Sequence, residues 1–255
     1  MIVRVLLAAL AAGLLAGIAM TPLQVSKVVP IIVQAEMFES GGGHDHGAAS
    51  AKVDHVHDDG SAHTADHNAV PAGEASKPDV TAAPEMAEDV LFFGRFWNTV
   101  IANSVTGAGF ALLMAAVSLF SGVNVTFTTG LAWGAAGWMA VQFLPALGLP
   151  PELPGFPYAD LTERQYWWVA TVALSIGGFV LLFLKRNTAT GLIGIALLVA
   201  PHIYGAPQPE DISSTVPAYL ASQYAVTSLG TTLFFWLVLG LALGWFMDRA
   251  KLETA

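Results

Sequence analysis

Residues 226–247 read VTSLGTTLFFWLVLGLALGWFM, a stretch without a single charged side chain. Its length matches the ~20 residues that an α-helix needs to cross the hydrocarbon core of a bilayer. Apolar blocks of this kind recur along the chain, and each predicts another spanning helix: 5–23, 99–120, 127–149, 166–184 and 189–204. We therefore expect an all-α, polytopic bundle of about six transmembrane helices.

The composition agrees with a chain that is mostly embedded in lipid. Charged residues make up 11% of the 255 residues and the mean hydropathy is +0.60, whereas about a quarter of the residues in a soluble domain are charged. The acidic residues lie outside the apolar blocks. The formal net charge of -9 therefore describes solvated segments, and we expect membrane lipid and no nucleic acid as partner.

Several kinds of chemistry are excluded by residues that the sequence lacks. The chain has no cysteine, which removes disulfides, thiolate metal sites and thiol nucleophiles, so a metal would need nitrogen and oxygen ligands. The motifs G-x-x-x-x-G-K-[ST], H-E-x-x-H and G-x-S-x-G are also absent. We expect no enzymatic activity and no permanently bound cofactor.

Charge placement favours six spans over five. The block at 189–204 is short and ends near Pro201, so a chain with five spans is an alternative. With six spans, most of the basic residues that flank the blocks gather on one side, as the positive-inside rule expects: Arg4, Lys185, Arg186, Arg249 and Lys251, whereas Lys27, Arg95 and Arg164 fall on the other side. Both termini would then lie in the cytoplasm.

The chain divides into three parts. Residues 1–39 are expected to form the first transmembrane helix and its outer extension, 40–90 an extracytoplasmic loop, and 91–255 the rest of the bundle. The loop is rich in Gly, Ala, Asp and His, so we expect it to be disordered without a ligand. A signal peptide is an alternative for the first block, but its apolar stretch exceeds the ~7–15 residues of a signal core.

Six of the seven histidines lie in this loop, within HDH (44–46), HVHDD (55–59) and SAHTADH (61–67). Imidazole interleaved with carboxylate suits divalent cations such as Co, Ni, Zn and Cu(II), although it does not specify which one. The alternative is a solvated linker that happens to be rich in histidine. The residues that predict metal capture are His44, His46, His55, His57, His63 and His67.

The seventh histidine, His202, lies in PHIYGAPQP (201–209) at the outer end of the fifth block. Proline and glycine end the helix there, so main-chain oxygens and an imidazole can converge, as at the broken helices of permeases. Glu36 and Glu39, spaced i, i+3 beyond the first block, would complete a mixed N/O metal site with His202. The alternatives are a histidine that caps a helix and two solvated acids at the membrane border.

Asn103 and Gln142 are the candidates for a translocation path through the bundle. The apolar blocks carry no clear Asp, Glu, Lys or Arg at mid-depth, which argues against a proton relay. The two carboxamides can line a path for an ion, or they can make hydrogen bonds between helices.

Glycine and aromatic spacing predict how the helices pack. The G-x-x-x-G motifs at 13–17, 130–134 and 240–244 let two backbones approach closely, and we favour packing within the chain over a subunit interface. Aromatic residues at the block ends predict anchoring at the membrane interface: Phe92, Phe93, Phe96, Trp97, Tyr166, Trp167, Trp168, Trp245 and Phe246.

Short segments distributed nearly end to end carry a family likeness: RVLLAAL (4–10), QAEMFE (34–39), TGAGF (106–110), PALGLPPELPG (145–155), RQYWW (164–168) and PHIYGAPQP (201–209). In order and spacing they resemble the CbtA family of predicted bacterial cobalt transporter subunits. The resemblance implies a membrane subunit for cobalt uptake linked to cobalamin synthesis, often with a small single-span partner called CbtB. Such proteins are usually described with about five spans. Glu36, Glu39 and His202 fall within the matching segments.

These observations predict a permease subunit of the bacterial inner membrane. Its cargo would be a divalent metal, cobalt in preference to nickel or zinc, collected by the histidine-rich loop and passed through the Glu36, Glu39 and His202 mouth to Asn103 and Gln142. Two alternatives remain open: a membrane protein that buffers or senses metal without moving it, and an accessory subunit of a separate energised transporter.

Overall fold

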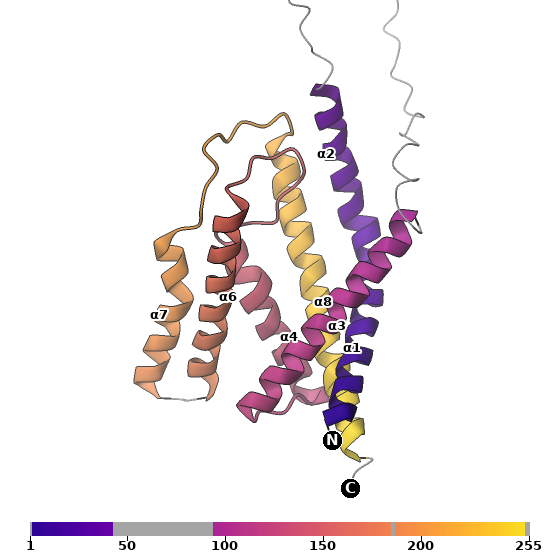
Figure 1. The fold of residues 1–255 in the computed structure, drawn as a ribbon, viewed down its shortest axis with the longest axis vertical. Helices are drawn as coiled ribbons and strands as arrows, with labels where there is room; N and C mark the ends of the chain where they lie inside the picture. The colour runs from indigo at the N-terminus through magenta and orange to yellow at the C-terminus, as the bar shows by residue number, and fades with distance from the viewer. Residues whose placement is uncertain (1, 43–93, 185–186, 253–255) are drawn as a thin grey trace, which may run out of the picture.

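The computed structural model describes residues 2–42, 94–184 and 187–252 (Figure 1). Every regular element in these ranges is helical, which confirms the all-α fold. The elements join into six continuous helical runs: α1 (Ile2–Leu23), the π-helix η1 (Gln24–Val28) and α2 (Val29–Gly42); α3 (Gly94–Ser121); α4 (Phe127–Trp138), the π-helix η3 (Met139–Phe143) and α5 (Leu144–Ala146); α6 (Leu161–Leu184); α7 (Thr188–Tyr204); and α8 (Ala218–Leu252).

Successive runs alternate in direction, so that α1 begins and α8 ends at the same end of the bundle (Figure 1). We call this the proximal end and the opposite one the distal end. Within the described ranges, four helices are long and apolar enough to cross a membrane: Ile2–Phe38, Phe96–Ser121, Leu161–Phe183 and Ala218–Ala250. At 17 residues, α7 rises only about 25 Å, and η3 divides the remaining run. The alternation agrees with a polytopic bundle of about six passes.

Glycine seams join the helices in two pairs. Gly13 of α1 lies against the backbone of Gly107 in α3, and Gly17 lies one turn further along the same seam. Gly130 of α4 lies in the same way against the backbone of Gly240 in α8. A Cβ atom at any of these positions would collide with main-chain atoms of the facing helix, so the predicted packing within the chain is confirmed.

The core lies where the two pairs meet. Ala12 and Ala16 of α1 are fully buried, as are Leu239 and Leu243 of α8, and Trp236 fills the space beside them. The small α1 side chains bring that helix close to α8, and the large α8 side chains occupy the volume between the pairs. The outward faces carry exposed apolar side chains throughout, as a lipid-facing surface requires.

Each of the two π-helices precedes a proline, whereas Pro22 of α1 and Pro201 of α7 follow regular α-helix. Pro30 stands two residues beyond η1, and Pro145 stands two residues beyond η3. Proline has no N–H and its ring clashes with the carbonyl four residues earlier, so the regular hydrogen-bond ladder cannot run through these positions. The chain widens into a π turn just before Pro30 and Pro145.

The α6–α7 hairpin packs mainly on itself. Gly178 and Gly194 let the two helices approach, and the side chain of Asn187 caps α7 by accepting a hydrogen bond from Thr190 N at 2.9 Å. This hairpin meets the rest of the bundle at α5 and η3, near the distal end. Its proximal half stands apart from α4 in Figure 1.

Candidate functional site

A hydrogen-bonded network holds η1 to α3. Asn103 Nδ2 donates to Thr21 Oγ1 at 3.1 Å and to Gln24 Oε1 at 2.8 Å, while the Thr21 hydroxyl donates to the carbonyl of Gly17 at 3.0 Å. Asn103 therefore makes the interhelical bonds that were the alternative to lining a path. These bonds orient the carboxamide of Gln24, and a place for Asn103 on a translocation path stays a prediction.

Gln24 opens onto a cavity of about 200 Å³ in the distal half of the bundle, which we call the polar pocket. Two π-helices and α8 enclose it. Its lining residues are Met20, Gln24, Val28, Gln142, Pro151, Tyr224, Ser228, Leu229, Thr231 and Thr232. None of them is Asp, Glu, His, Lys or Arg. The predicted path residue Gln142 thus lies in a neutral polar cavity, together with Gln24, which the sequence reasoning had not selected.

The α8 side of the polar pocket presents hydrogen-bond acceptors. The Thr231 hydroxyl donates to the carbonyl of Ser228 at 3.0 Å, and the Thr232 hydroxyl donates to the carbonyl of Leu229 at 3.1 Å. Because each hydroxyl proton is used on the backbone, the oxygen offers only lone pairs to other partners. Trp138 Nε1 donates to the carbonyl of Leu229 at 3.2 Å and to Thr232 Oγ1 at 3.3 Å, whereas the Thr231 oxygen accepts no hydrogen bond from another described residue in these contacts.

A second group of residues forms what we call the distal cluster: Gly148, Glu152, Arg164, Trp167, Pro201 and His202. Trp167 Nε1 donates to the carbonyl of Pro201 at 3.3 Å, and the Trp167 and His202 rings meet edge to face with centroids 6.0 Å apart. Nε2 of His202 is buried and has no hydrogen-bond partner among the described residues. Such an atom is suited to a ligand that the protein does not itself supply.

Trp167 corrects one prediction. With 6% of its surface exposed, it is not an anchor at the membrane interface. Its ring lies between the end of α7 and Gly148 of the loop after α5, and its N–H satisfies a carbonyl near the helix end. Its neighbours Tyr166 and Trp168 are exposed, so within this aromatic run the predicted interfacial position is wrong for Trp167 alone.

The loop between α5 and α6 connects the distal cluster to the polar pocket. Arg164 and Glu152 form an ion pair at 2.6 Å, and Pro151 lines the polar pocket. Burial raises the pKa of Glu152, an effect that the Arg164 guanidinium partly opposes. The loop between α5 and α6 therefore contacts both the distal cluster and the polar pocket. Its Glu152 carboxylate belongs to the cluster and does not line the pocket.

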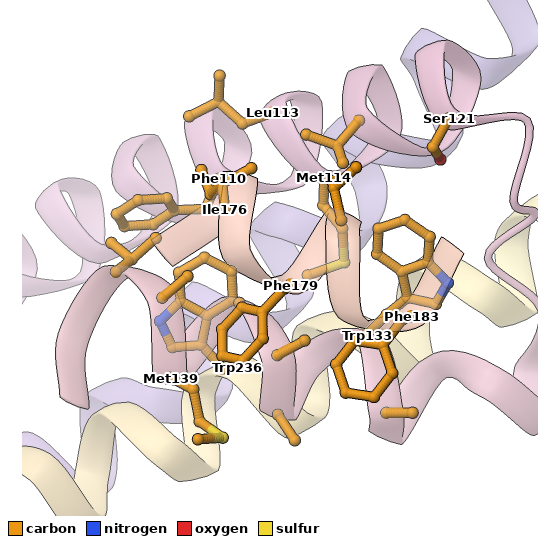
Figure 2. Close-up of a pocket in the computed structure, with 18 of the residues that line it drawn as sticks. Phe110, Leu113, Met114, Ser121, Trp133, Met139, Ile176, Phe179, Phe183 and Trp236 are labelled. Atoms are coloured by element: carbon orange, nitrogen blue, oxygen red, sulfur yellow. The ribbon is translucent and has the colours of Figure 1, made fainter. Parts of the chain in front are cut away.

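A larger cavity, the apolar groove, lies between α3, α4 with η3, and α6 (Figure 2). It encloses about 810 Å³ and is lined almost wholly by apolar side chains, including Phe110, Met114, Trp133, Phe179 and Trp236. Figure 2 shows these aromatic and aliphatic side chains around one space, with Ser121 at an edge. A cavity of this kind suits a hydrocarbon surface and not an ion.

The CbtA family model, described as a probable cobalt transporter subunit, matches residues 2–248. The chain belongs to the CbtA family. No curated protein and no solved structure gives a significant match. As a CbtA protein the chain is a transporter subunit with apolar spanning helices, which makes it an integral membrane protein.

The structure brings together the segments that carry the CbtA resemblance. Gly148 packs against Trp167 and Ala206, and Ala35 of α2 packs in one cluster with Leu153. TGAGF meets the opening helix where Gly107 contacts Gly13. Segments of this CbtA chain that carry the resemblance and lie far apart in the sequence are therefore in contact in the fold.

The predicted mixed metal site remains a prediction. Glu36 lies in α2 beside Ala35, whereas α7 with His202 stands on the opposite side of the bundle, with α8 and α6 between them (Figure 1). Among the residues that the structure describes, no three His, Asp or Glu side chains come together. The Glu39 side chain and the six loop histidines lie outside the described residues.

Proposed function

We propose that this CbtA protein is the permease subunit for uptake of a divalent transition metal, cobalt in preference to nickel or zinc, and that it supplies cobalamin synthesis from the bacterial inner membrane. The observation that carries the proposal is the polar pocket. Gln24, Gln142 and Thr231 gather around one cavity inside a bundle that is mostly apolar, and polar side chains that face a cavity within a membrane protein mark pathways for polar cargo.

The proposed route begins at the distal end, which would face away from the cytoplasm while both termini face it. The loop histidines collect metal, and the distal entrance is flanked by His202 of α7 on one side of the bundle and by Glu36 and Glu39 of α2 on the other. The buried, unpartnered Nε2 of His202 supports a ligand role for that residue. The ion then reaches the polar pocket past the loop that carries Pro151.

The test is uptake of radiolabelled cobalt by cells with and without the chain, and with the variant Gln142→Leu. We expect uptake to depend on the chain and to fall in the variant, because the substitution replaces a polar lining group by an apolar one. Gln223→Leu is the matched control, since Gln223 is an exposed residue of α8 outside the pocket lining. Equal uptake with and without the chain contradicts the proposal.

A second candidate function is that of an accessory subunit in a larger energised transporter, and the apolar groove favours it. A groove of about 810 Å³ between α3, α4 and α6 can receive the apolar face of a partner's spanning helix. A small single-span CbtB-type subunit is the partner we propose. Uptake that disappears when this partner is omitted from reconstituted vesicles supports the accessory role, and undiminished uptake excludes it.

The groove can be tested directly because the chain has no cysteine. Leu113→Cys places a thiol at the groove, and Leu14→Cys places one on the lipid-facing side of α1. Oxidation with a single-cysteine partner should cross-link the first variant and spare the second. Cross-linking at both positions indicates random collision in the membrane.

Metal buffering by the loop makes a different prediction. Deletion of residues 41–83 removes all six loop histidines. A permease should keep transport at high metal concentration after this deletion, whereas a buffer should lose its whole activity.

A further inference from the structure

The polar pocket offers oxygen and amide groups but no charge. Its lining includes the carboxamides of Gln24 and Gln142 and the hydroxyls of Ser228 and Thr231, and it includes no carboxylate or imidazole. A divalent ion that lost its water here would exchange a full shell of water ligands for the few oxygen atoms of the lining, in a poorly solvated space. Without a compensating negative charge, that exchange is unfavourable.

The size of the pocket suggests that the ion can enter without exchanging its water ligands for protein ligands. A volume of about 200 Å³ holds roughly six water molecules at ~30 Å³ each. Six waters form the single shell of an octahedral aqua ion. The cavity is therefore large enough for a first-row divalent ion with its water and much larger than a bare ion needs.

The hydrogen-bond polarity of the lining points the same way. Water bound to a cation directs its protons outward, so an aqua ion needs acceptors around it. Thr231 has already used its proton on the Ser228 carbonyl and presents lone pairs. Gln24 Oε1 accepts one hydrogen bond from Asn103, which fixes the carboxamide and leaves this oxygen one further lone pair for a donor in the pocket.

We infer that the polar pocket binds the metal as its octahedral aqua complex, through hydrogen bonds from coordinated water to Gln24, Gln142 and Thr231, with no direct metal–protein bond. This inference rests on the proposed function, since it takes the pocket to lie on the cargo's route. It follows that the pocket selects for the size and charge of the hydrated ion. Discrimination among cobalt, nickel and zinc then belongs to the nitrogen and oxygen ligands of the mouth.

Hexaamminecobalt(III) is the probe for this inference, because its ammine ligands do not exchange on the time scale of the experiment. The complex has the shape of an octahedral aqua ion and directs N–H donors outward. It should inhibit uptake of labelled cobalt by the wild-type protein. In Thr231→Val, which keeps the side-chain shape but removes the acceptor, the inhibition constant should rise about fivefold.

Thr171→Val is the matched control. Thr171 is also a fully buried helical threonine whose hydroxyl donates to a backbone carbonyl, that of Trp167 at 2.8 Å, and it lies outside the pocket lining. This variant should be inhibited like the wild type. Ser228→Ala provides a second pocket variant and should weaken inhibition in the same direction as Thr231→Val.

The outcomes separate the inference from the function on which it rests. Cobalt uptake that hexaamminecobalt(III) does not inhibit, or inhibits equally in wild type, Thr231→Val and Ser228→Ala, overturns the aqua-ion inference and leaves the permease standing. If the chain moves no cobalt, the permease proposal fails. Equilibrium dialysis of hexaamminecobalt(III) against the purified full chain then decides the inference: saturable binding weakened by Thr231→Val supports it, and absent or unchanged binding overturns it.

Discussion

The polar pocket and the apolar groove share η3 as a wall, yet one encloses about 200 Å³ and the other about 810 Å³. The smaller cavity gathers carboxamides and hydroxyls, and the larger gathers aromatic and aliphatic side chains. Volume alone would select the groove as the main site. The chemistry of a transported ion selects the pocket, because an ion needs hydrogen-bond partners that the groove does not have.

The difference between the two cavities arises within five residues. Met139, Ala140 and Val141 line the groove, whereas Gln142 lines the pocket. In an α-helix, residues three apart lie on nearly the same face. The wider turn of η3 separates Met139 from Gln142 and turns the carboxamide away from the groove. A local backbone feature thereby gives one helix an apolar and a polar side.

We expect the largest effect from a substitution in the contact between α4 and α8, because both cavities depend on it. Gly240→Val places side-chain atoms against the backbone of Gly130 and forces α4 away from α8, so neither cavity survives. We expect most of the protein to be lost as an unfolded or aggregated fraction in size-exclusion chromatography. Gly230→Val in the same helix is the control, since no atom lies within contact distance of a Cβ there. Equal losses in the two variants would show that helix propensity, and not the seam, is responsible.

Thiol labelling tests the two-sided character of η3 in the folded protein. With no native cysteine, Gln142→Cys and Met139→Cys each carry one thiol. A small charged thiol reagent reacts with ionised thiols that water reaches. We expect Gln142→Cys to react at least about tenfold faster than Met139→Cys, because only the pocket is polar.

Protection by cobalt, the proposed cargo, provides a direct control for the labelling rates. Cobalt added before the reagent should slow labelling of Gln142→Cys and leave Met139→Cys unchanged. Similar rates at the two positions would mean that water reaches both sides of η3, and the contrast between the cavities would then be lost.

Pro145→Ala asks whether the proline maintains this contrast. Restoring the missing N–H lets the ladder run as a regular α-helix, which should turn residue 142 toward the groove. We expect cobalt uptake to fall several-fold in a protein that remains folded, and the difference in labelling rate between positions 139 and 142 to shrink. Pro22→Ala is the control, because Pro22 stands before η1 and not beyond it. Unchanged labelling in Pro145→Ala would assign the π turn to tertiary packing alone.

Much of the fold was predictable because a bilayer leaves few choices. An uncharged run of about 20 residues must satisfy its backbone within itself, so the blocks predicted helices directly. Glycine spacing predicted close packing but not its partners. Only the structure shows that Gly130 faces Gly240 and that Gly13 faces Gly107. The spacing of glycines shows that a helix has a flat face, but it does not show which helix packs on that face.

The site was less predictable for a different reason. Gln24 follows the first apolar block directly, and its place in the pocket depends on a π turn and on Asn103 from another helix. The spacing of Pro30 and Pro145 two residues beyond the two π-helices is a signal that could have found it. Trp167 was assigned to the interface because aromatic residues at helix ends usually lie there, and its contact with Pro201 comes from tertiary packing.

The smallest expected effect concerns the charge pair next to the polar pocket. Glu152 follows the pocket residue Pro151, and burial raises the pKa of its carboxyl above the ordinary value near 4.5 while Arg164 lowers it. Between the ordinary value and the raised one, the folded protein binds more protons than the unfolded chain. Stability therefore falls as pH rises through that window.

Arg164→Gln removes the opposing charge, so the pKa of Glu152 should rise further and the window should widen. The melting temperature of the variant in detergent should lie further below that of the wild type at pH 7 than at pH 4, by about 1–3 °C. In a Glu152→Gln background the same substitution should have no pH dependence, since the titrating carboxyl is gone. A pH dependence that persists there would assign the effect to another group. If neither background shows a pH dependence, water screens the interaction between Glu152 and Arg164. The pair would then have no electrostatic effect on the neutral pocket beside it.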